Sequence, residues 1–124
     1  MEFPYDLRHD PPAPVLPVRI GVPGGNPGVL LSALVDTGAD ATVIPEGIAT
    51  QLGLPPVDQV RVRGVGPMLV PAIVYAAEVE VIGVRRVMTV LGLGNEALLG
   101  RDLLNDWTAI LRGPRRTMEV LREG

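Results

Sequence analysis

The sequence predicts a mainly β fold, a closed or partly closed β-barrel with two short helices. Three observations support this prediction. The chain has 124 residues, which suits a single hydrophobic core. Its hydrophobic content of 47% is typical of a folded protein rather than a disordered one. Its 15 glycines and 13 prolines separate many short β-like segments by turns.

The amino-terminal part differs from the rest of the chain. Residues 1–17 carry five of the prolines and no periodic pattern of apolar residues. We therefore expect a mobile or loosely docked arm at 1–17, followed by one domain at 18–124.

The first half of the domain alternates strand-like and turn-like sequence. Residues 18–22 and 29–35 are separated by P-G-G-N-P-G, which predicts a β-hairpin, and 41–44 is another short strand. A helix is expected over 45–52, because proline suits a first helical turn and Gly53 can end the helix.

The second half is expected to hold four more strands and a second helix. Residues 59–63 and 78–84 alternate apolar and polar residues, and an apolar run separates these two strands. A final pair of strands, 85–91 and 117–121, brackets the second helix. This helix is predicted from apolar residues at helical spacing: Leu99, Leu103, Leu104 and Trp107.

Composition excludes several classes of function. The chain has no cysteine, so it has no disulfide, thiolate nucleophile or cysteine-ligated zinc, and its one histidine, His9, cannot form a multi-histidine metal site. A net charge of −3 argues against nucleic acid as a partner. No apolar stretch is long enough to span a membrane and no secretory signal is visible, so a cytoplasmic location is expected.

The segment 33–45, A-L-V-D-T-G-A-D-A-T-V-I-P, places polar residues between two apolar strands. Asp36, Thr37 and Gly38 are common turn residues, so a plain turn is one interpretation. The other is a catalytic loop, because a carboxylate at the end of a buried strand is costly unless it is paired, hydrogen-bonded or protonated. The D-T-G sequence alone does not decide between them.

Three segments in the same order resemble the retropepsin-like aspartic proteases. Segment 33–45 is similar to their active-site loop, and 97–104, A-L-L-G-R-D-L-L, is similar to their second conserved block. Between them, 62–68, V-R-G-V-G-P-M, resembles the glycine-rich tip of their flap hairpin. The resemblance covers residues 18–121. The helix at 45–52 and the G-R-D sequence are features of cellular and bacterial relatives rather than viral ones.

The resemblance implies an aspartic endopeptidase of peptide substrates that needs no metal or other cofactor. Since D-T-G occurs once, it implies a homodimer in which Asp36 faces its own copy across a two-fold axis. Thr37 would brace the two loops across that axis, and the Gly38 carbonyl would meet the substrate backbone.

Further site residues follow from the same resemblance. Asp40 would contact the substrate main chain and pair with Arg101, while Val65 and Gly66 would lie at the flap tip and close over the peptide. Side-chain pockets would be apolar, with apolar residues preferred around the cleaved bond; core packing is the alternative role of these pocket residues, which are Leu34, Ala39, Val43 and Leu98.

Two other interpretations of the whole chain stay open. One is a non-catalytic dimerisation or peptide-binding module that retains the fold. The other is the protease part of a larger polyprotein or of a membrane-tethered chain.

Overall fold

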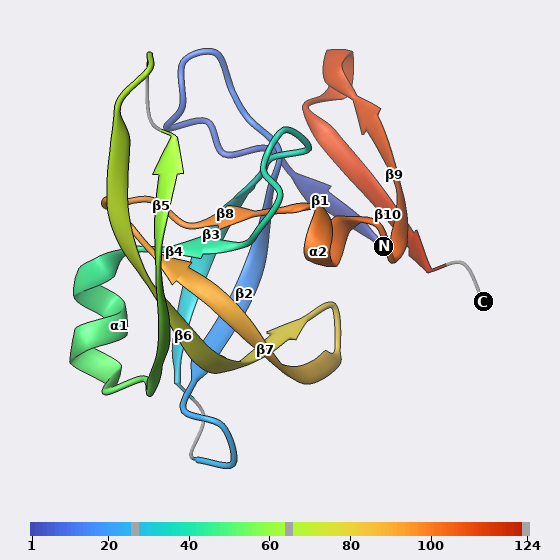
Figure 1. Ribbon diagram of the computed structural model, residues 1–124. Coiled ribbons are helices and arrows are strands. Elements are labelled where there is room, and N and C mark those ends of the chain that lie inside the picture. The colour runs from blue at the N-terminus through green and yellow to red at the C-terminus, as the bar shows by residue number, and fades with distance from the viewer. Residues whose placement is uncertain (26–27, 64–65, 123–124) are drawn as a thin grey trace.

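The computed structural model describes residues 1–25, 28–63 and 66–122 (Figure 1). These residues form a seven-stranded sheet, a separate three-stranded sheet and two short α-helices. The strands of the larger sheet are β2 (Val15–Gly21), β3 (Val29–Val35), β4 (Val43–Ile44), β5 (Pro56–Arg63), β6 (Leu69–Val81), β7 (Val84–Gly92) and β8 (Leu98–Leu99).

Six strands of the larger sheet close into a barrel. Their order is β2-β3-β8-β4-β7-β6, and β6 pairs back onto β2. Closure leaves none of these six strands as a free edge along its whole length. The barrel interior is filled by apolar side chains, of which the largest fully buried ones in the barrel strands are Leu16, Val18, Ile20, Ile44, Val79, Val90 and Leu99.

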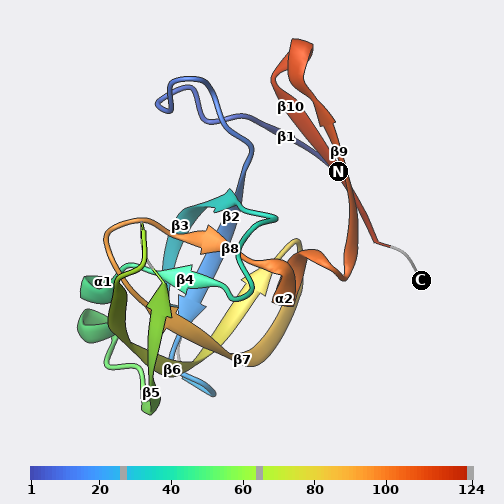
Figure 2. The same cartoon turned by 45° about the horizontal axis from the view of Figure 1, so that its top comes forward.

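The length of β6 explains how a hairpin extends from this barrel. Residues 78–81 of β6 pair with β2, whereas residues 69–75 pair with β5 on the same edge. The β5–β6 hairpin therefore projects past the barrel (Figures 1 and 2). We call this projecting part, residues 59–63 and 69–73 as described, the flap.

Helix α1 (Glu46–Leu52) confirms the first predicted helix. Pro45 is its N-cap, and Gly53 ends it in a left-handed conformation with φ of 68°. This conformation costs glycine little because it has no Cβ. Ala49 and Leu54 are buried, so the helix covers one side of the barrel.

The second predicted helix was too long. Helix α2 covers only Arg101–Leu104; Leu99 belongs to β8, and Trp107 begins β9 (Trp107–Arg112). Apolar residues spaced like one helical face here come from three successive elements, each of which buries its own side chain. Periodicity alone cannot separate these two arrangements over so short a stretch.

The strand boundaries also differ from prediction. The apolar run and the strand expected at 78–84 form one continuous strand, β6, which ends at a tight turn over residues 82–83. The two final strands do not pair with each other. Residues 85–91 belong to β7 and pair with β6, whereas β10 (Thr117–Arg122) pairs with β9.

The three-stranded sheet stands beside the barrel and contains both ends of the described chain (Figure 2). Its order is β1-β10-β9, with β1 at Glu2–Pro4. A one-turn 3-10 helix, η1 (Gly113–Arg115), connects β9 to β10. The terminal ammonium of Met1 donates a hydrogen bond to the carbonyl of Val120 at 3.0 Å. The division between residues 17 and 18 stays a prediction, and residue 17 lies inside β2.

Candidate active site

Asp36 directly follows β3, and β8 fixes its backbone. The Asp36 amide donates to the Leu99 carbonyl at 3.0 Å, and the Leu34 amide donates to the Ala97 carbonyl at 2.9 Å. These bonds extend the parallel β3–β8 pairing by one residue into the loop. Asp36 itself is half-buried, so its carboxylate lies where a buried strand reaches the surface.

The carboxylate of Asp36 is oriented by its own loop. The Gly38 amide donates to Asp36 Oδ1 at 3.0 Å, and the Ala39 amide donates to the Asp36 carbonyl at 3.2 Å. The first bond closes an Asx turn, and the second closes a β-turn over the same residues. One carboxylate oxygen is thus held, while the other receives no hydrogen bond from the described residues.

Arg101 connects this loop to helix α2. Its guanidinium donates to the Thr37 carbonyl at 2.7 Å and pairs with the carboxylate of Asp40, as the sequence predicted. The Arg101 amide donates to the Ala39 carbonyl at 2.9 Å. Since the Asp40 side chain is 90% exposed, the ion pair itself adds little stability. Its main effect is to fix the direction of both side chains.

A polar cluster around the buried Thr42, beneath the loop, escaped the sequence prediction. The Thr42 hydroxyl donates to Asp102 Oδ1 at 2.7 Å, and the Thr42 amide donates to Asp102 Oδ2 at 3.0 Å. The Thr42 hydroxyl also accepts the Gly100 amide at 3.2 Å. Thr42 is only 2% exposed, so every one of its polar groups needs such a partner. The one hint in the sequence was that the segments A-T-V-I and G-R-D place polar residues next to apolar ones.

Gly100 lets the two halves of the site approach each other. A Cβ at this position would lie 2.5 Å from the carbonyl carbon and 2.6 Å from the oxygen of Ala41. Only glycine fits this contact without moving backbone. Loop 36–42 is thereby packed directly on the start of α2.

Three of the four predicted pocket residues lie side by side. Leu98 pairs with Leu34 of β3 on one side and with Val43 of β4 on the other. Leu34 and Leu98 are half-buried, while Val43 is almost fully buried and contributes to the core. Ala39 is half-buried and lies apart from them, within the Asp36 loop.

The flap begins at a fixed base and ends near Gly66. At its base, the Tyr75 hydroxyl donates to Glu46 Oε1 at 2.6 Å, joining β6 to the first turn of α1. This hydrogen bond, with burial and the negative charge of Glu46, raises the pKa of Tyr75. Gly66 is exposed and has φ of 82°. The predicted tip residue Val65 lies outside the described residues.

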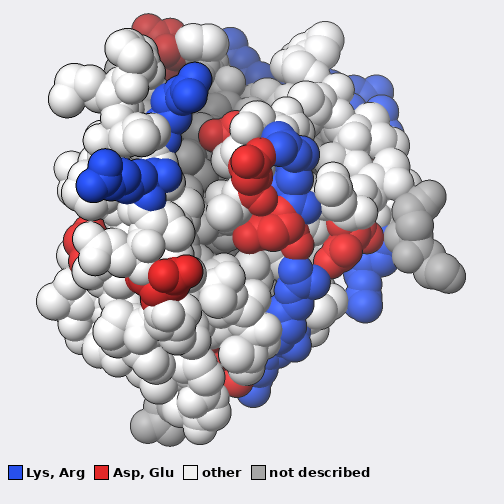
Figure 3. All heavy atoms as spheres, viewed as in Figure 1, with Lys and Arg blue, Asp and Glu red and all other residues white. Residues whose placement is uncertain are grey.

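Space remains between the flap and the barrel. Figure 3 shows a hollow between the flap and the centre of this face, with acidic side chains beside it. Within residues 1–25, 28–63 and 66–122, no group of three His, Cys, Asp or Glu side chains could hold a metal ion. None of the helices described is long and apolar enough to cross a membrane.

Comparison with known proteins identifies the family. Residues 25–106, more than half of the chain, match the family described as "gag-polyprotein putative aspartyl protease". No curated protein matches the chain in sequence.

Solved structures match the fold. A retropepsin-like aspartic protease from Rickettsia conorii matches with a TM-score of 0.60 and 18% identity, over 98% of this chain and 92% of that one. The EIAV protease in complex with the inhibitor HBY-793 matches with a TM-score of 0.52 and 25% identity, over 84% and 93%.

A foamy viral protease-reverse transcriptase also matches, with a TM-score of 0.57 and 20% identity over 73% of this chain. The chain spans only 11% of that larger protein. The family match and the barrel with its flap agree with each other. The chain therefore belongs to the retropepsin-like aspartic proteases.

Proposed function

We propose that the protein is an aspartic endopeptidase that acts as a homodimer, with Asp36 of each copy forming the catalytic pair. The observation that carries this proposal is the Asp36 loop. It occurs once per chain, its carboxylate is half-buried and held through one oxygen by Gly38, and Asp36 itself ends a fixed strand. An arrangement that needs two carboxylates is completed most simply by a second copy.

Two such carboxylates share one proton, because two negative charges at close range cannot both persist; this coupled pair is the known device of aspartic proteases. The ionised carboxylate takes a proton from a water, and the water oxygen bonds to the carbonyl carbon of the peptide. The protonated carboxyl donates its proton to the carbonyl oxygen. The C–N bond then breaks as the nitrogen takes up a proton, which leaves a new carboxyl and a new amine.

The loop residues support this chemistry in distinct ways. The Gly38 amide keeps Asp36 Oδ1 in place, so the second oxygen is the one free to meet water and the partner copy. Thr37 is exposed beside it and suits contact across the dimer axis. The Gly38 carbonyl and the Asp40 carboxylate would hold the peptide backbone, and Arg101 would keep Asp40 aimed at it.

The apolar residues explain the expected preference around the cleaved bond. Leu34 of β3 and Leu98 of β8 are half-buried neighbours. An apolar side chain of the substrate can therefore bury them further. Ala39 and Val43 would complete these pockets. Gly66, together with Val65, would close over the peptide from the flap.

The three-stranded sheet is a candidate for part of the dimer contact. Its outer strands, β1 and β9, each have one edge without a partner strand in the described residues. Leu111 and Leu121 are 60% and 42% exposed on this small sheet. Exposed apolar side chains beside free strand edges favour association with a second chain.

The test combines assembly with cleavage. Sedimentation gives the oligomeric state, and a mixed peptide library gives cleavage with and without pepstatin. We expect a dimer whose pepstatin-sensitive cleavage is abolished in Asp36→Asn and retained in Asp10→Asn, a matched change at an exposed acid. Undiminished cleavage by Asp36→Asn would overturn the proposal. A dimer that binds peptides but cleaves none from pH of about 3 to 8 would instead indicate the non-catalytic module.

A further inference from the structure

The inner side of the flap follows from strand alternation. In the lower part of β6 every second side chain, from Tyr75 to Val81, is buried in the barrel interior. Side chains of a strand alternate between its two faces. By this geometric alternation Leu69, Pro71 and Ile73 share a face with Tyr75, although there they are exposed and Ala72 on the other face is buried.

The pairing register carries this assignment onto β5. Arg63 lies opposite Leu69, Arg61 opposite Pro71, and Gln59 opposite Ile73. Directly opposed residues of an antiparallel pair share a face. We call this set the inner face of the flap; its members are Gln59, Arg61, Arg63, Leu69, Pro71 and Ile73.

The inner face borders open space. A groove of about 660 Å³ is lined by Gln59, Arg61, Leu69 and Pro71, together with Val60. A second groove, of about 370 Å³, adjoins it at Gln59 and Pro71. It extends to Ile73 and the loop containing Leu93, Gly94 and the α1 residue Glu46. The flap thus borders two adjoining grooves, with apolar residues contributed by β6 and arginines by β5.

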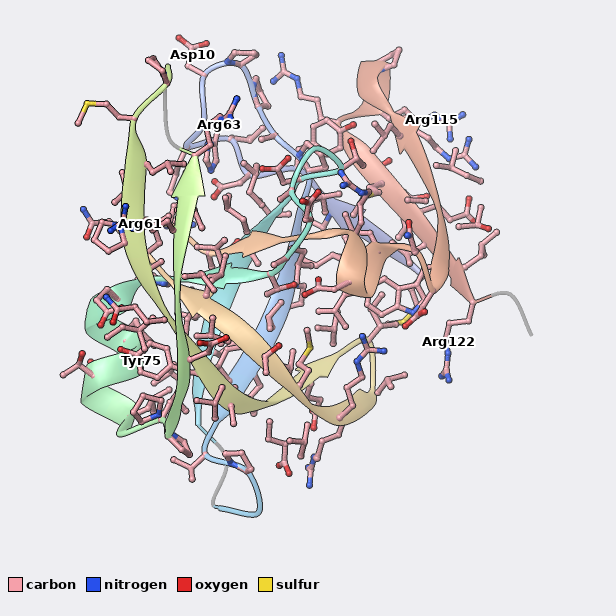
Figure 4. All side chains as sticks on the ribbon, in the orientation of Figure 1. Asp10, Arg61, Arg63, Tyr75, Arg115 and Arg122 are labelled. Atoms are coloured by element: carbon pink, nitrogen blue, oxygen red, sulfur yellow. The ribbon has the colours of Figure 1, made fainter. Side chains whose placement is uncertain are left out.

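The two arginines are available for a ligand. Both are exposed on the flap (Figure 4). The ion pairs and side-chain hydrogen bonds found among the described residues include neither arginine. Glu46, the acid that lines the adjoining groove, already accepts the Tyr75 hydroxyl. Asp58 of β5 lies opposite Val74 in the register, next to the irregularity in β5, and accepts the Gln59 amide. Arg61 and Arg63 therefore lack a carboxylate partner within the described chain.

Their spacing matches an extended peptide. Residues two apart on a strand are separated by about 7 Å, the distance between alternate side chains of any extended chain. A peptide lying along β5 would bring two of its side chains to the arginines in turn. Arginine binds carboxylates with directed hydrogen bonds as well as charge.

We infer that Arg61 and Arg63 make the protein select substrates with acidic side chains at alternate positions, outside the apolar residues at the cleaved bond. The inference rests on the proposed function, because it takes the peptide to run between the flap and the Asp36 loop. The pocket residues alone would select only for apolar side chains at the cleaved bond. The two arginines would add a selection for negative charge further along the peptide.

The test compares matched peptides. A peptide cleaved from the library is remade with Glu or Gln at each position flanking the bond, and kcat/KM is measured for each at low salt. We expect Glu to be preferred at two alternate positions, by about threefold at each, the size of an exposed charge pair. The preference should fall towards one at about 0.5 M salt, because exposed charges are screened.

Variants assign the effect to the flap. Arg61→Gln and Arg63→Gln should each remove the preference for Glu over Gln at one position. Arg115→Gln, a matched change at an exposed arginine of η1 (Figure 4), should retain both preferences. Equal cleavage of Glu and Gln peptides, or a preference that survives both flap variants, would overturn the inference.

A binding measurement separates this inference from the proposed function. Fluorescence anisotropy of labelled Glu and Gln peptides is recorded with Asp36→Asn, alone and combined with Arg61→Gln and Arg63→Gln. We expect about threefold tighter binding of the Glu peptide, lost in the flap variants, even if no wild-type cleavage is found. Binding without discrimination, or no binding of either peptide, would contradict the role of the arginines.

Discussion

The Asp36 loop and the flap are the two parts of the proposed site, and they are built differently. The loop is fixed from several directions, through Leu99 of β8, Arg101 of α2 and the buried Thr42–Asp102 pair. The flap is held along its length by the pairing of β5 with β6, and only its base is tied to α1.

Side chains are also more exposed in the flap than beneath the loop. Thr42 beneath the loop is 2% exposed, whereas Met68 and Leu69 near the flap tip are 71% and 51% exposed. A segment with few buried contacts opens at low free energy, while one held by a buried network opens only with much of the domain. Under the proposed function, the loop positions the carboxylate and the flap is suited to admit and cover a peptide.

The strongest destabilisation is expected where the Asp36 loop packs on α2. Gly100→Ala puts a Cβ within 2.6 Å of the Ala41 backbone, so the loop or α2 must shift. We expect a loss of about 3 kcal/mol or more in the free energy of unfolding, measured by urea denaturation. Gly47→Ala in α1 is the control, because nothing lies within 4 Å of its Cβ; it should gain about 0.5–1 kcal/mol. Equal effects of the two changes would contradict this packing.

A smaller destabilisation is expected from breaking the Thr42–Asp102 pair below the loop. Asp102→Ala leaves the hydroxyl and amide of Thr42 without acceptors, which should cost about 2–3 kcal/mol in the free energy of unfolding. Under the proposed function, peptide cleavage should also fall, because the loop that carries Asp36 loses its support. Asp106→Ala, at an exposed acid of the same region, should cost less than about 1 kcal/mol. A harmless Asp102→Ala would show that the pair does not support the loop.

The flap base gives a smaller effect with a characteristic pH dependence. Tyr75→Phe removes the hydrogen bond to Glu46 and should cost about 1 kcal/mol at neutral pH. Because the pKa of Tyr75 is raised in the folded protein, this stabilisation is complete below pH of about 10 and declines as the pH rises further. Urea denaturation of both proteins at several pH values measures the difference. A difference that instead grows above pH of about 10 would be inconsistent with a donating hydroxyl.

The smallest perturbation compares the two sides directly, without mutation. We expect amide hydrogen exchange in the flap, residues 59–63 and 69–73, to be faster than at Asp36, Thr42 and Arg101, whose amides donate to the site framework. Adding a bound peptide should slow exchange in the flap more than in the loop. Equal protection of the flap and loop amides in the free protein would contradict the expected difference in their local stability.

The sequence predicted the fixed side better than the flap. The hairpin at β2–β3, helix α1 and the Asp40–Arg101 ion pair all depend on local patterns or on motifs with a fixed spacing. The length of α2 was overestimated, because some of the apolar residues at helical spacing belong to the neighbouring strands β8 and β9. The Thr42–Asp102 pair was missed because its residues are 60 positions apart, and the pairing of β4 with β8 brings their two segments together only in the folded chain.

Under the proposed function, the active unit needs Asp36 from two copies. The most direct measurement mixes wild type with Asp36→Asn at constant total protein, allows subunits to exchange, and records cleavage against the wild-type fraction. If two Asp36 carboxylates are required, activity follows the square of that fraction and falls to about one quarter in an equal mixture. Activity proportional to the wild-type fraction, about one half in the equal mixture, would mean that each chain acts alone and would contradict the claim.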